Sequence, residues 1–316
     1  MEANFNDALK LIESSGRVLL TMHERMDGDD GGSVLAMRQA LVALGKQVTC
    51  VIKFGVPEQL EFLPGSEHIL ENTNKLDFDL LIMFGCSTKK RCGLENLMEL
   101  KCPVINIDHH QDNELYGEVS IVQPEISSVA ELLYNFFIFA KWPISTNTAT
   151  CLLTGIITDT GSFRHSNTAA STLKVAAELM KKGALIDKIV KKTFRSKTIE
   201  TLKAWGKAME NSFYQAEQKI MYSIMTEEDL ASVGQLPQAA FEGFVETLNS
   251  VPEAKFAIFL RQDGDVIKGS LRSDSFKKIN VAEIAKIFGG GGHIQAAGFS
   301  VIGKLEKNQL GQWKVI

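Results

Sequence analysis

The first half of the chain alternates short apolar runs with segments of helical periodicity, which narrows the possible folds sharply. The apolar runs are nearly continuous in Val, Ile and Leu, as is typical of strands buried on both faces, and lie at residues 17–22, 47–52, 79–84 and 104–107. Helical patterns cover residues 33–44, 128–140 and 146–157. This alternation predicts an α/β fold with a parallel sheet, in which reactive groups collect where strands end and loops begin.

A second alternation follows a helical stretch that runs from residue 168 to residue 211. It consists of strand patterns at 219–225, 255–261 and 266–271 and helical patterns at 241–248 and 281–288. With 316 residues, and roughly 100–200 residues per domain, the chain is expected to form two α/β domains. We predict a parallel-sheet domain over 1–190, a helical linker over 191–212 and a smaller mixed-sheet domain over 213–316.

The composition of the chain argues against several classes of protein. The chain has 34 Lys and Arg against 38 Asp and Glu, a net charge of −4, which argues against long duplex nucleic acid as a partner. No stretch reaches the ~18 apolar residues of a membrane span, and the polar first ten residues do not resemble a secretion signal, so no membrane partner is expected. Five cysteines without a C-x-x-C pair predict a reducing compartment, the cytoplasm.

Two groups of residues allow more than one interpretation. Cys86, Cys92 and Cys102 would suit a zinc site only with unusual ligand spacing, and buried thiols are the favoured alternative. The basic residues of the helical stretch form either a solvated helix face or the wall of an anion-binding cleft; they are Lys191, Lys192, Arg195 and Lys197.

Acidic and histidine residues follow several of the predicted elements. The first strand runs into His23 and the sequence Met26-Asp27-Gly28-Asp29-Asp30-Gly31, the fourth runs into Asp108-His109-His110, and a helical run ends at Asp159. Each group alone is a common turn or capped loop. Together, at one edge of a parallel sheet, they would repel one another without cations, and their oxygen and nitrogen donors suit Mn²⁺, Mg²⁺ or Zn²⁺. Two such ions about 3.5–4 Å apart can activate a water and clamp a phosphoryl group.

With these motifs the chain resembles the DHH phosphoesterase superfamily, named for the triplet seen here as Asp108-His109-His110. The resemblance covers nearly the full length, because residues 289–298 (GGGGHIQAAG) are similar to the glycine-rich motif of the DHH-associated C-terminal domain. Within the superfamily the chain is most similar to stand-alone nano-RNases that also dephosphorylate 3′-phosphoadenosine 5′-phosphate, and to cyclic dinucleotide phosphodiesterases. The resemblance implies a hydrolase that cleaves short oligonucleotides or dinucleotides to mononucleotides, and leaves a homodimer open.

The resemblance also implies roles for single residues of the first domain. One metal ion would be held by His23 and Asp27, and the other by Asp29, His109 and Asp159; both would be Mn²⁺, with Mg²⁺ or Co²⁺ as alternatives. The resemblance further places His110 against the phosphate and gives Asp108 the task of orienting the histidines, so that these two residues are the expected catalytic pair.

Substrate binding is expected to use residues of both domains. The glycine run lets backbone N–H groups approach a phosphate, and an arginine offers a forked contact. A flexible loop and a surface ion pair are the respective alternatives. The candidate residues are Arg91, Arg272, Ser273, Gly290, Gly291, Gly292 and His293.

One motif of the resemblance is broken. The strand at 79–84 should deliver an aspartate that bridges both metal ions, but the sequence has Gly85 there. Asp77 and Asp79 lie at the opposite end of that strand. The ion at His23 and Asp27 is therefore expected to keep only two protein ligands, and the enzyme to be impaired. The alternatives are a nucleotide-binding protein of the same family without turnover and, less well supported by the glycine-rich ending, a pyrophosphatase.

Overall fold

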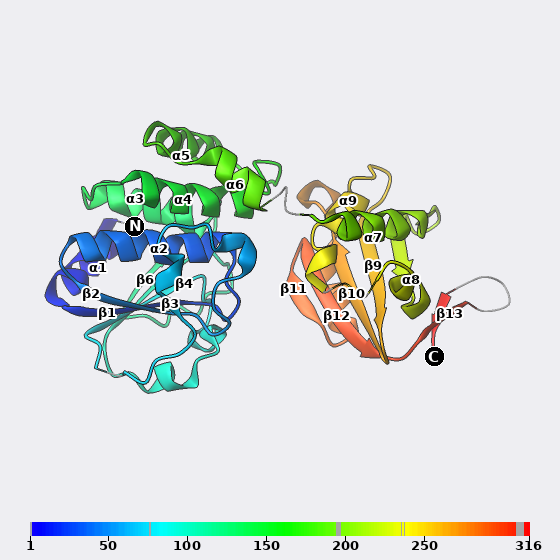
Figure 1. Ribbon diagram of the computed structural model, residues 1–316, viewed down its shortest axis with the longest axis horizontal. Helices are drawn as coiled ribbons and strands as arrows, with labels where there is room; N and C mark the ends of the chain where they lie inside the picture. The colour runs from blue at the N-terminus through cyan, green and yellow to red at the C-terminus, as the bar shows by residue number, and fades with distance from the viewer. Residues whose placement is uncertain (1, 76, 194–196, 235, 237, 308–312) are drawn as a thin grey trace. The chain divides into compact units, whose positions relative to one another are not determined.

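The computed structural model describes residues 2–75, 77–193, 197–234, 236, 238–307 and 313–316. It divides into two compact units, 1–196 and 197–316, and each is described here by itself. Arg195, one of the basic residues named above, lies outside the described residues. The predicted α/β class is confirmed, with a parallel sheet in the first unit and a mixed sheet in the second (Figure 1). The limits proposed for the linker, 191 and 212, remain a prediction.

The first unit is built on a six-stranded sheet in the order β3-β2-β1-β4-β5-β6, in which every described pair is parallel. The strands are β1 (Arg17–Met22), β2 (Gln47–Val51), β3 (Ile69–Leu70), β4 (Leu80–Phe84), β5 (Val104–Asp108) and β6 (Val119–Val122). In the middle of the sheet β1, β4 and β5 are neighbours, so their carboxyl ends lie side by side at one edge. This edge carries the His and Asp residues that the sequence singled out.

Alternate side chains of these strands enter two separate cores, which explains their continuous apolar sequence. Leu20 and Ile82 face the helical layer, whereas Leu19, Leu81 and Met83 pack under short 3₁₀ turns on the other face. The helices are α1 (Glu2–Ser14), α2 (Gly28–Ala43), α3 (Val129–Phe139), α4 (Thr146–Asp159), α5 (Ala170–Lys181) and α6 (Ile186–Thr193). Helices α2 and α3 contact the strands, α4 packs on both, and α5 and α6 cover α4 (Figure 1).

The second unit contains a six-stranded sheet in the order β11-β12-β10-β9-β8-β7, in which β8 and β9 are parallel and the other pairs antiparallel. Its strands are β7 (Ser212–Gln215), β8 (Ile220–Met225), β9 (Phe256–Asp263), β10 (Val266–Arg272), β11 (Gly291–His293) and β12 (Ala296–Ile302), with a separate pair β13 (Leu305–Lys307) and β14 (Trp313–Val315). Its helices are α7 (Ile199–Glu210), α8 (Glu227–Ser232), α9 (Phe244–Asn249) and α10 (Val281–Ile287). Helices α7 and α9 supply apolar residues to one face of the sheet and α10 to the other.

Several predicted limits were wrong, and one error concerns the site directly. The helix expected over residues 33–44 begins at Gly28, because the Asp27 side chain caps it by accepting a hydrogen bond from the Asp30 N–H at 2.9 Å. The two following aspartates therefore lie in the first turn of α2, not in a loop. The short edge strands β3, β6, β7 and β11 were not predicted, since a few residues give no usable periodicity.

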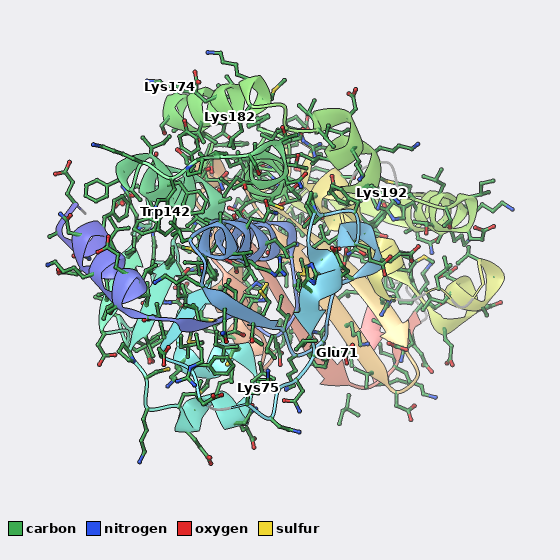
Figure 2. All side chains as sticks on the ribbon, turned by 60° about the vertical axis from the view of Figure 1, so that its left-hand side comes forward. Glu71, Lys75, Trp142, Lys174, Lys182 and Lys192 are labelled. Carbon is green, nitrogen blue, oxygen red and sulfur yellow. The ribbon has the colours of Figure 1, made fainter. Side chains whose placement is uncertain are left out.

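Of the basic residues of the helical stretch, Lys191 and Lys192 lie exposed near the end of α6 in the first unit, whereas Lys197 belongs to the second unit and donates to the Glu242 carbonyl at 2.8 Å. Figure 2 shows Lys174 on α5, Lys182 directly after α5 and Lys192 near the end of α6, and all three are exposed. This exposure fits the interpretation as a solvated face. Among the described residues, no helix is both long and apolar enough to cross a bilayer.

Candidate metal centre

Two groups of three side chains that could hold a metal ion lie at the carboxyl edge of the first sheet. His23 follows β1, His109 follows β5, and Asp159 is the last residue of α4. The remaining members, Asp27, Asp29 and Asp30, come from the start of α2. Within each group the ligand atoms all lie within 4.8 Å of one another; the groups are His23, Asp27, Asp30 and Asp29, His109, Asp159.

The first group contains one residue more than the sequence analysis expected. The Nε2 atom of His23 lies 3.1 Å from Oδ2 of Asp27 and 3.0 Å from Oδ2 of Asp30. The sequence analysis did not include Asp30, which the structure offers as a third candidate ligand; the expectation that this position keeps only two protein ligands stays a prediction. The early start of α2 turns Asp30 inward, where its side chain is only 4% exposed.

The second group unites the three residues that the resemblance implied. His109 Nε2 and Asp159 Oδ2 are 3.9 Å apart, and the Nδ1 atom of the same ring lies 3.3 Å from the carbonyl oxygen of Ile126. A proton on Nδ1 that is donated to this carbonyl leaves Nε2 as the ligand atom facing the carboxylates. Asn167 donates to Oδ2 of Asp159 at 3.2 Å and holds this carboxylate from outside the group.

Asp29 is buried at the meeting point of three helices. Its two carboxylate oxygens accept hydrogen bonds from the backbone N–H groups of Val129 and Ala130, at 2.7 and 2.9 Å, in the first turn of α3. This helix N-terminus is a favourable place for a negative charge. Close packing of α2 and α4 depends on glycine, because a Cβ on Gly155 would lie 2.8 Å from Oδ1 of Asp29.

The electrostatics of the two groups show a strong excess of buried negative charge. Burial, together with repulsion from Asp159 and the neighbouring aspartates, raises the pKa of Asp29 well above its ordinary value. Burial also raises the pKa of Asp159 to about 6. Burial alone would lower the pKa of His23, but the carboxylates of Asp27 and Asp30 outweigh it and raise that pKa to about 10.

Divalent cations fit this arrangement. Its donors are carboxylate oxygens and imidazole nitrogens without any thiolate, the set that hard and borderline ions prefer. One carboxylate oxygen, Oδ1 of Asp30, is buried without a hydrogen-bond partner among the described residues, and a bound cation would supply that partner.

The predicted catalytic pair is in direct contact. His110 Nδ1 lies 2.6 Å from Oδ1 of Asp108, and this oxygen also accepts the backbone N–H groups of His109 and His110. Asn113 donates to the other oxygen at 2.5 Å. Asp108 thus orients the ring of His110, whereas the ring of His109 is held by Ile126; sequence reasoning assigned both rings to Asp108 and missed Asn113.

Gly85 lies at the end of β4, with its N–H donating to the Ile107 carbonyl at 3.0 Å. A Cβ built there would overlap Oδ2 of Asp30, and the residue has a positive φ of 58°. At the far end of the same strand, Arg17 pairs with Asp77 and Asp79 at 2.7 and 2.8 Å. As expected, neither of these aspartates reaches the metal centre.

Arg91 belongs to the first unit and follows β4 in a short 3₁₀ turn (Lys89–Cys92). Its Nη1 atom lies 3.4 Å from Oγ of Ser87, and its positive charge opposes the rise that Asp108 causes in the pKa of His110. The cysteine alternative loses support, because burial raises the pKa values of Cys86, Cys92 and Cys102.

The remaining substrate-binding candidates belong to the second unit. Arg272 ends β10 and donates from Nε to Oε1 of Glu246 at 2.7 Å, and the buried Ser273 donates its N–H to the Gln295 carbonyl. A Cβ on Gly290 or Gly292 would overlap the backbone of β12, so these two glycines are required by packing. Gly291 has open space beside its Cα. The backbone of His293 pairs with Ala296; its side chain lies outside the described set.

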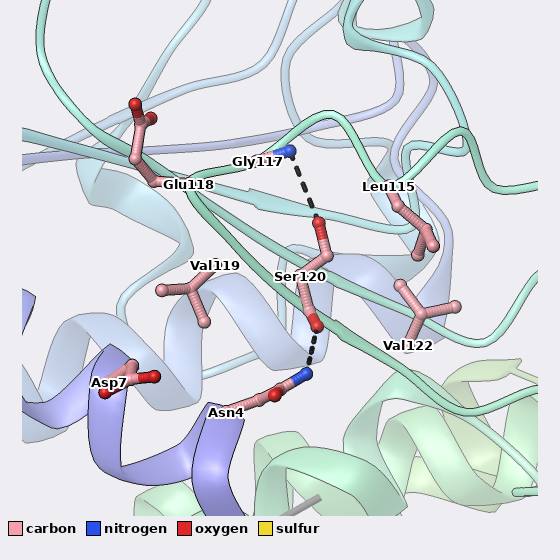
Figure 3. A pocket seen from close by; sticks show the side chains of 8 residues that line it. All are labelled: Asn4, Asp7, Leu115, Gly117, Glu118, Val119, Ser120 and Val122. Atoms are coloured by element: carbon pink, nitrogen blue, oxygen red, sulfur yellow. Dashed lines mark hydrogen bonds between the residues drawn. The ribbon is translucent and has the colours of Figure 1, made fainter.

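A separate concave surface lies beside β6 and contains none of the metal-centre residues (Figure 3). Asn4 of α1 spans it by donating to the carbonyl of Ser120 at 2.8 Å, and the acidic side chains of Asp7 and Glu118 lie along it (Figure 3). These acidic side chains do not favour a phosphate there.

The fold agrees with comparisons to known proteins. Residues 17–156 match the DHH family, N-terminal domain, and residues 218–311 match the DHHA1 domain. The chain therefore contains a DHH domain and a DHHA1 domain, and these domains identify it as a hydrolase.

Named relatives and a solved structure extend this result. The chain is 29% identical over 300 residues to a "bifunctional oligoribonuclease and PAP phosphatase NrnA" of Thermus thermophilus, covering 94% of this chain and 87% of the relative. It is 25% identical to the "cyclic-di-AMP phosphodiesterase GdpP" of Bacillus subtilis, covering 95% of this chain but 48% of that relative. The crystal structure of an "exopolyphosphatase-related protein" of Bacteroides fragilis superposes with a TM-score of 0.87 at 27% identity, covering 95% and 91% of the two chains.

Proposed function

We propose that the chain is a metal-dependent phosphodiesterase that hydrolyses short oligonucleotides, or linear and cyclic dinucleotides, to mononucleotides. The observation that carries the proposal is the pair of three-ligand groups at one sheet edge, directly beside the His110–Asp108 pair. The names of the relatives supply the nucleotide class, and 3′-phosphoadenosine 5′-phosphate is a second substrate to assay.

Manganese is the proposed cofactor, with Mg²⁺ or Co²⁺ as alternatives. His23, Asp27 and Asp30 would hold one ion, and Asp29, His109 and Asp159 the other. When bound, such ions would polarise a phosphoryl group. They would also lower the pKa of a bound water towards neutral pH. The protein supplies the fixed positions of the donors, through the N-terminus of α3 for Asp29 and the Ile126 carbonyl for His109.

His110 is the proposed contact to the phosphate. Its ring is fixed by Asp108, which is itself held by Asn113, so the imidazole needs no reorientation when charge develops on the phosphoryl oxygens. Arg91, Arg272, Ser273, Gly290, Gly291, Gly292 and His293 remain the proposed substrate-binding residues. The ion pair of Arg272 with Glu246 would have to open for a forked phosphate contact.

The second candidate function is nucleotide binding without turnover, which the sequence analysis derived from Gly85. The site favours an active enzyme, because Asp30 offers a third candidate ligand beside His23 and Asp27. Impairment by Gly85 remains a prediction, and the comparisons give it no support.

Incubation with a ribodinucleotide and Mn²⁺ separates the two candidates. An active enzyme releases mononucleotides. Its activity is lost in excess chelator and in the His109→Ala variant. A binding protein retains the intact dinucleotide, and this result would contradict the proposal. Parallel reactions with cyclic dinucleotide, 3′-phosphoadenosine 5′-phosphate and inorganic pyrophosphate rank the substrates; release of phosphate from pyrophosphate alone would favour the pyrophosphatase alternative.

We also propose a reducing location, the cytoplasm, and a homodimer as the state to test by light scattering. The five cysteines are all free, and burial raises the pKa values of Cys50 and Cys151 to about 12. Thiols of this kind are unreactive and suit a compartment without disulfides.

A further inference from the structure

We propose that Asp30 is a metal ligand shared by the two ions, and that Gly85 is the vacant position that makes room for its carboxylate. The inference rests on the metal dependence proposed above. It assigns the bridging role to a residue on helix α2 rather than to the end of strand β4.

The first observation is the mutual exclusion of two side chains. A Cβ at position 85 would overlap Oδ2 of Asp30, with the carboxylate carbon and the other oxygen also too close. Any side chain at position 85 would therefore displace this carboxylate. Since Asp30 occupies that space, a carboxylate is already present where a longer residue on β4 would place one.

The second observation is the unused bonding capacity of Asp30. The residue is 3% exposed, its Oδ2 contacts His23 at 3.0 Å, and its buried Oδ1 has no hydrogen-bond partner among the described residues. A buried carboxylate oxygen without a partner is costly in a finished core. A cation that binds this oxygen would remove the cost.

The third observation is that Asp30 adjoins the second group along α2, because Asp29, its neighbour in the first turn of that helix, is a member of that group. Its negative charge acts on Asp27 and His23 of its own group, and on Asp29 and Asp159 of the other. A carboxylate that belongs to one group, follows directly after a member of the other and has one oxygen to spare is suited to touch an ion in each.

A purely structural role for Asp30 is the competing explanation, in which the residue serves an ion pair with His23. The two roles predict opposite effects of Asp30→Asn on the protein without metal. As a metal ligand crowded by Asp27 and Asp29, Asp30 opposes folding until an ion binds, so Asp30→Asn should not lower the metal-free melting temperature. As a structural partner of His23, its loss should lower that temperature.

Metal binding itself is measured by calorimetric titration with Mn²⁺ in the absence of substrate. Wild type should bind two ions, and Asp30→Asn should weaken binding at least about tenfold or lose one ion. Because no nucleotide is present, this result stands whether or not the chain cleaves nucleotides. No Mn²⁺ binding by wild type would instead contradict the proposed function.

The exchange between positions 30 and 85 is tested with paired variants. Gly85→Asp alone should weaken Mn²⁺ binding, because the new side chain collides with Asp30. Asp30→Ala combined with Gly85→Asp should recover binding, since aspartate tolerates a positive φ better than most residues. The matched control is Asp30→Ala combined with Gly85→Asn, because Asn has the shape of Asp but not its charge. This control variant should not recover Mn²⁺ binding.

Three results would overturn the inference. The first is wild-type Mn²⁺ binding by Asp30→Asn, and the second is a lowered metal-free melting temperature of that variant. The third is equal Mn²⁺ binding by the two double variants, which would show that positions 30 and 85 are not alternative sources of one ligand.

Discussion

Nδ1 of His110 and Oδ1 of Asp108 lie 2.6 Å apart, and the carboxylate that makes this contact is fully buried. Burial alone would raise the pKa of Asp108, but its hydrogen bonds to His110 and Asn113 outweigh burial and lower it. The carboxylate therefore stays ionised and fixes the ring beside the metal centre, without belonging to either group of ligands.

Replacement of His110 by Ala should remove catalysis but leave metal binding intact. Loss of a positioned group that stabilises or transfers charge typically reduces the rate by about 10²–10⁴-fold. Steady-state kinetics on a dinucleotide should show this loss in kcat, while calorimetry still finds two Mn²⁺ ions. A kcat within about twofold of wild type would exclude a contact between His110 and the reacting phosphate.

Close packing of α2 against α4 should make Gly32 sensitive to substitution. A Cβ at this position would overlap the carbonyl oxygen of Cys151, so Gly32→Ala should lower the free energy of unfolding by about 1–3 kcal/mol. Gly206 in α7 is the matched control, since a Cβ there meets nothing within 4 Å. Gly206→Ala should raise that free energy by about 0.4–1 kcal/mol, and denaturant melts that show equal effects would contradict this account.

The contact between Asp79 and Arg17 should make stability depend on pH. Hydrogen bonds from the Arg17 side chain and from the backbone of Gly16 and Arg17 lower the pKa of Asp79 to about 2. An unfolded aspartate titrates near ~3.9, so the stabilisation is complete above that pH and is lost as the pH falls through 2.

The variant Asp79→Asn should therefore melt at a lower temperature than wild type at pH 7, and the difference should shrink towards pH 2. Asp77→Asn is the control, because it removes only an exposed ion pair and should have a smaller effect. A difference that stays constant from pH 7 to pH 2 would show that Asp79 acts through its shape rather than its charge.

Removal of Arg272 should weaken substrate binding without changing the metal centre. A charge-assisted hydrogen bond contributes about 1.5–3 kcal/mol, so Arg272→Ala should raise KM for a dinucleotide by about tenfold or more. Lys268→Ala on the same strand is the control for lost positive charge. An unchanged KM, together with a lower melting temperature, would assign Arg272 to its ion pair with Glu246 alone.

The strands of the first sheet were predictable because both of their faces are buried. Apolar side chains occupy nearly every position of β1 and β4, and this pattern can be recognised from the sequence alone. The edge strand β6 is only partly buried and has four residues, and its pattern is too weak to read. The parallel order then implied that His23 and His109 would meet at one edge, and the structure places both there.

Asp30 could not be assigned from the sequence because its role depends on where α2 begins. In the sequence Asp27-Gly28-Asp29-Asp30, a turn and a helix start are equally compatible with the residues. Only the capping of the Asp30 N–H by Asp27 settles that Asp29 faces α3 and Asp30 faces Gly85. The sequence shows that Gly85 has no side chain, but it does not show that the Asp30 carboxylate fills the space beside it.

Two divalent ions should bind at the carboxyl edge of the first sheet, one in each group of three ligands. Native mass spectrometry after equilibration with Mn²⁺ counts these ions directly, for wild type and for His109→Ala. We predict two ions per wild-type chain and one for the variant, with dinucleotide cleavage lost together with the second ion. A wild-type chain that binds one ion, or none, would contradict the account.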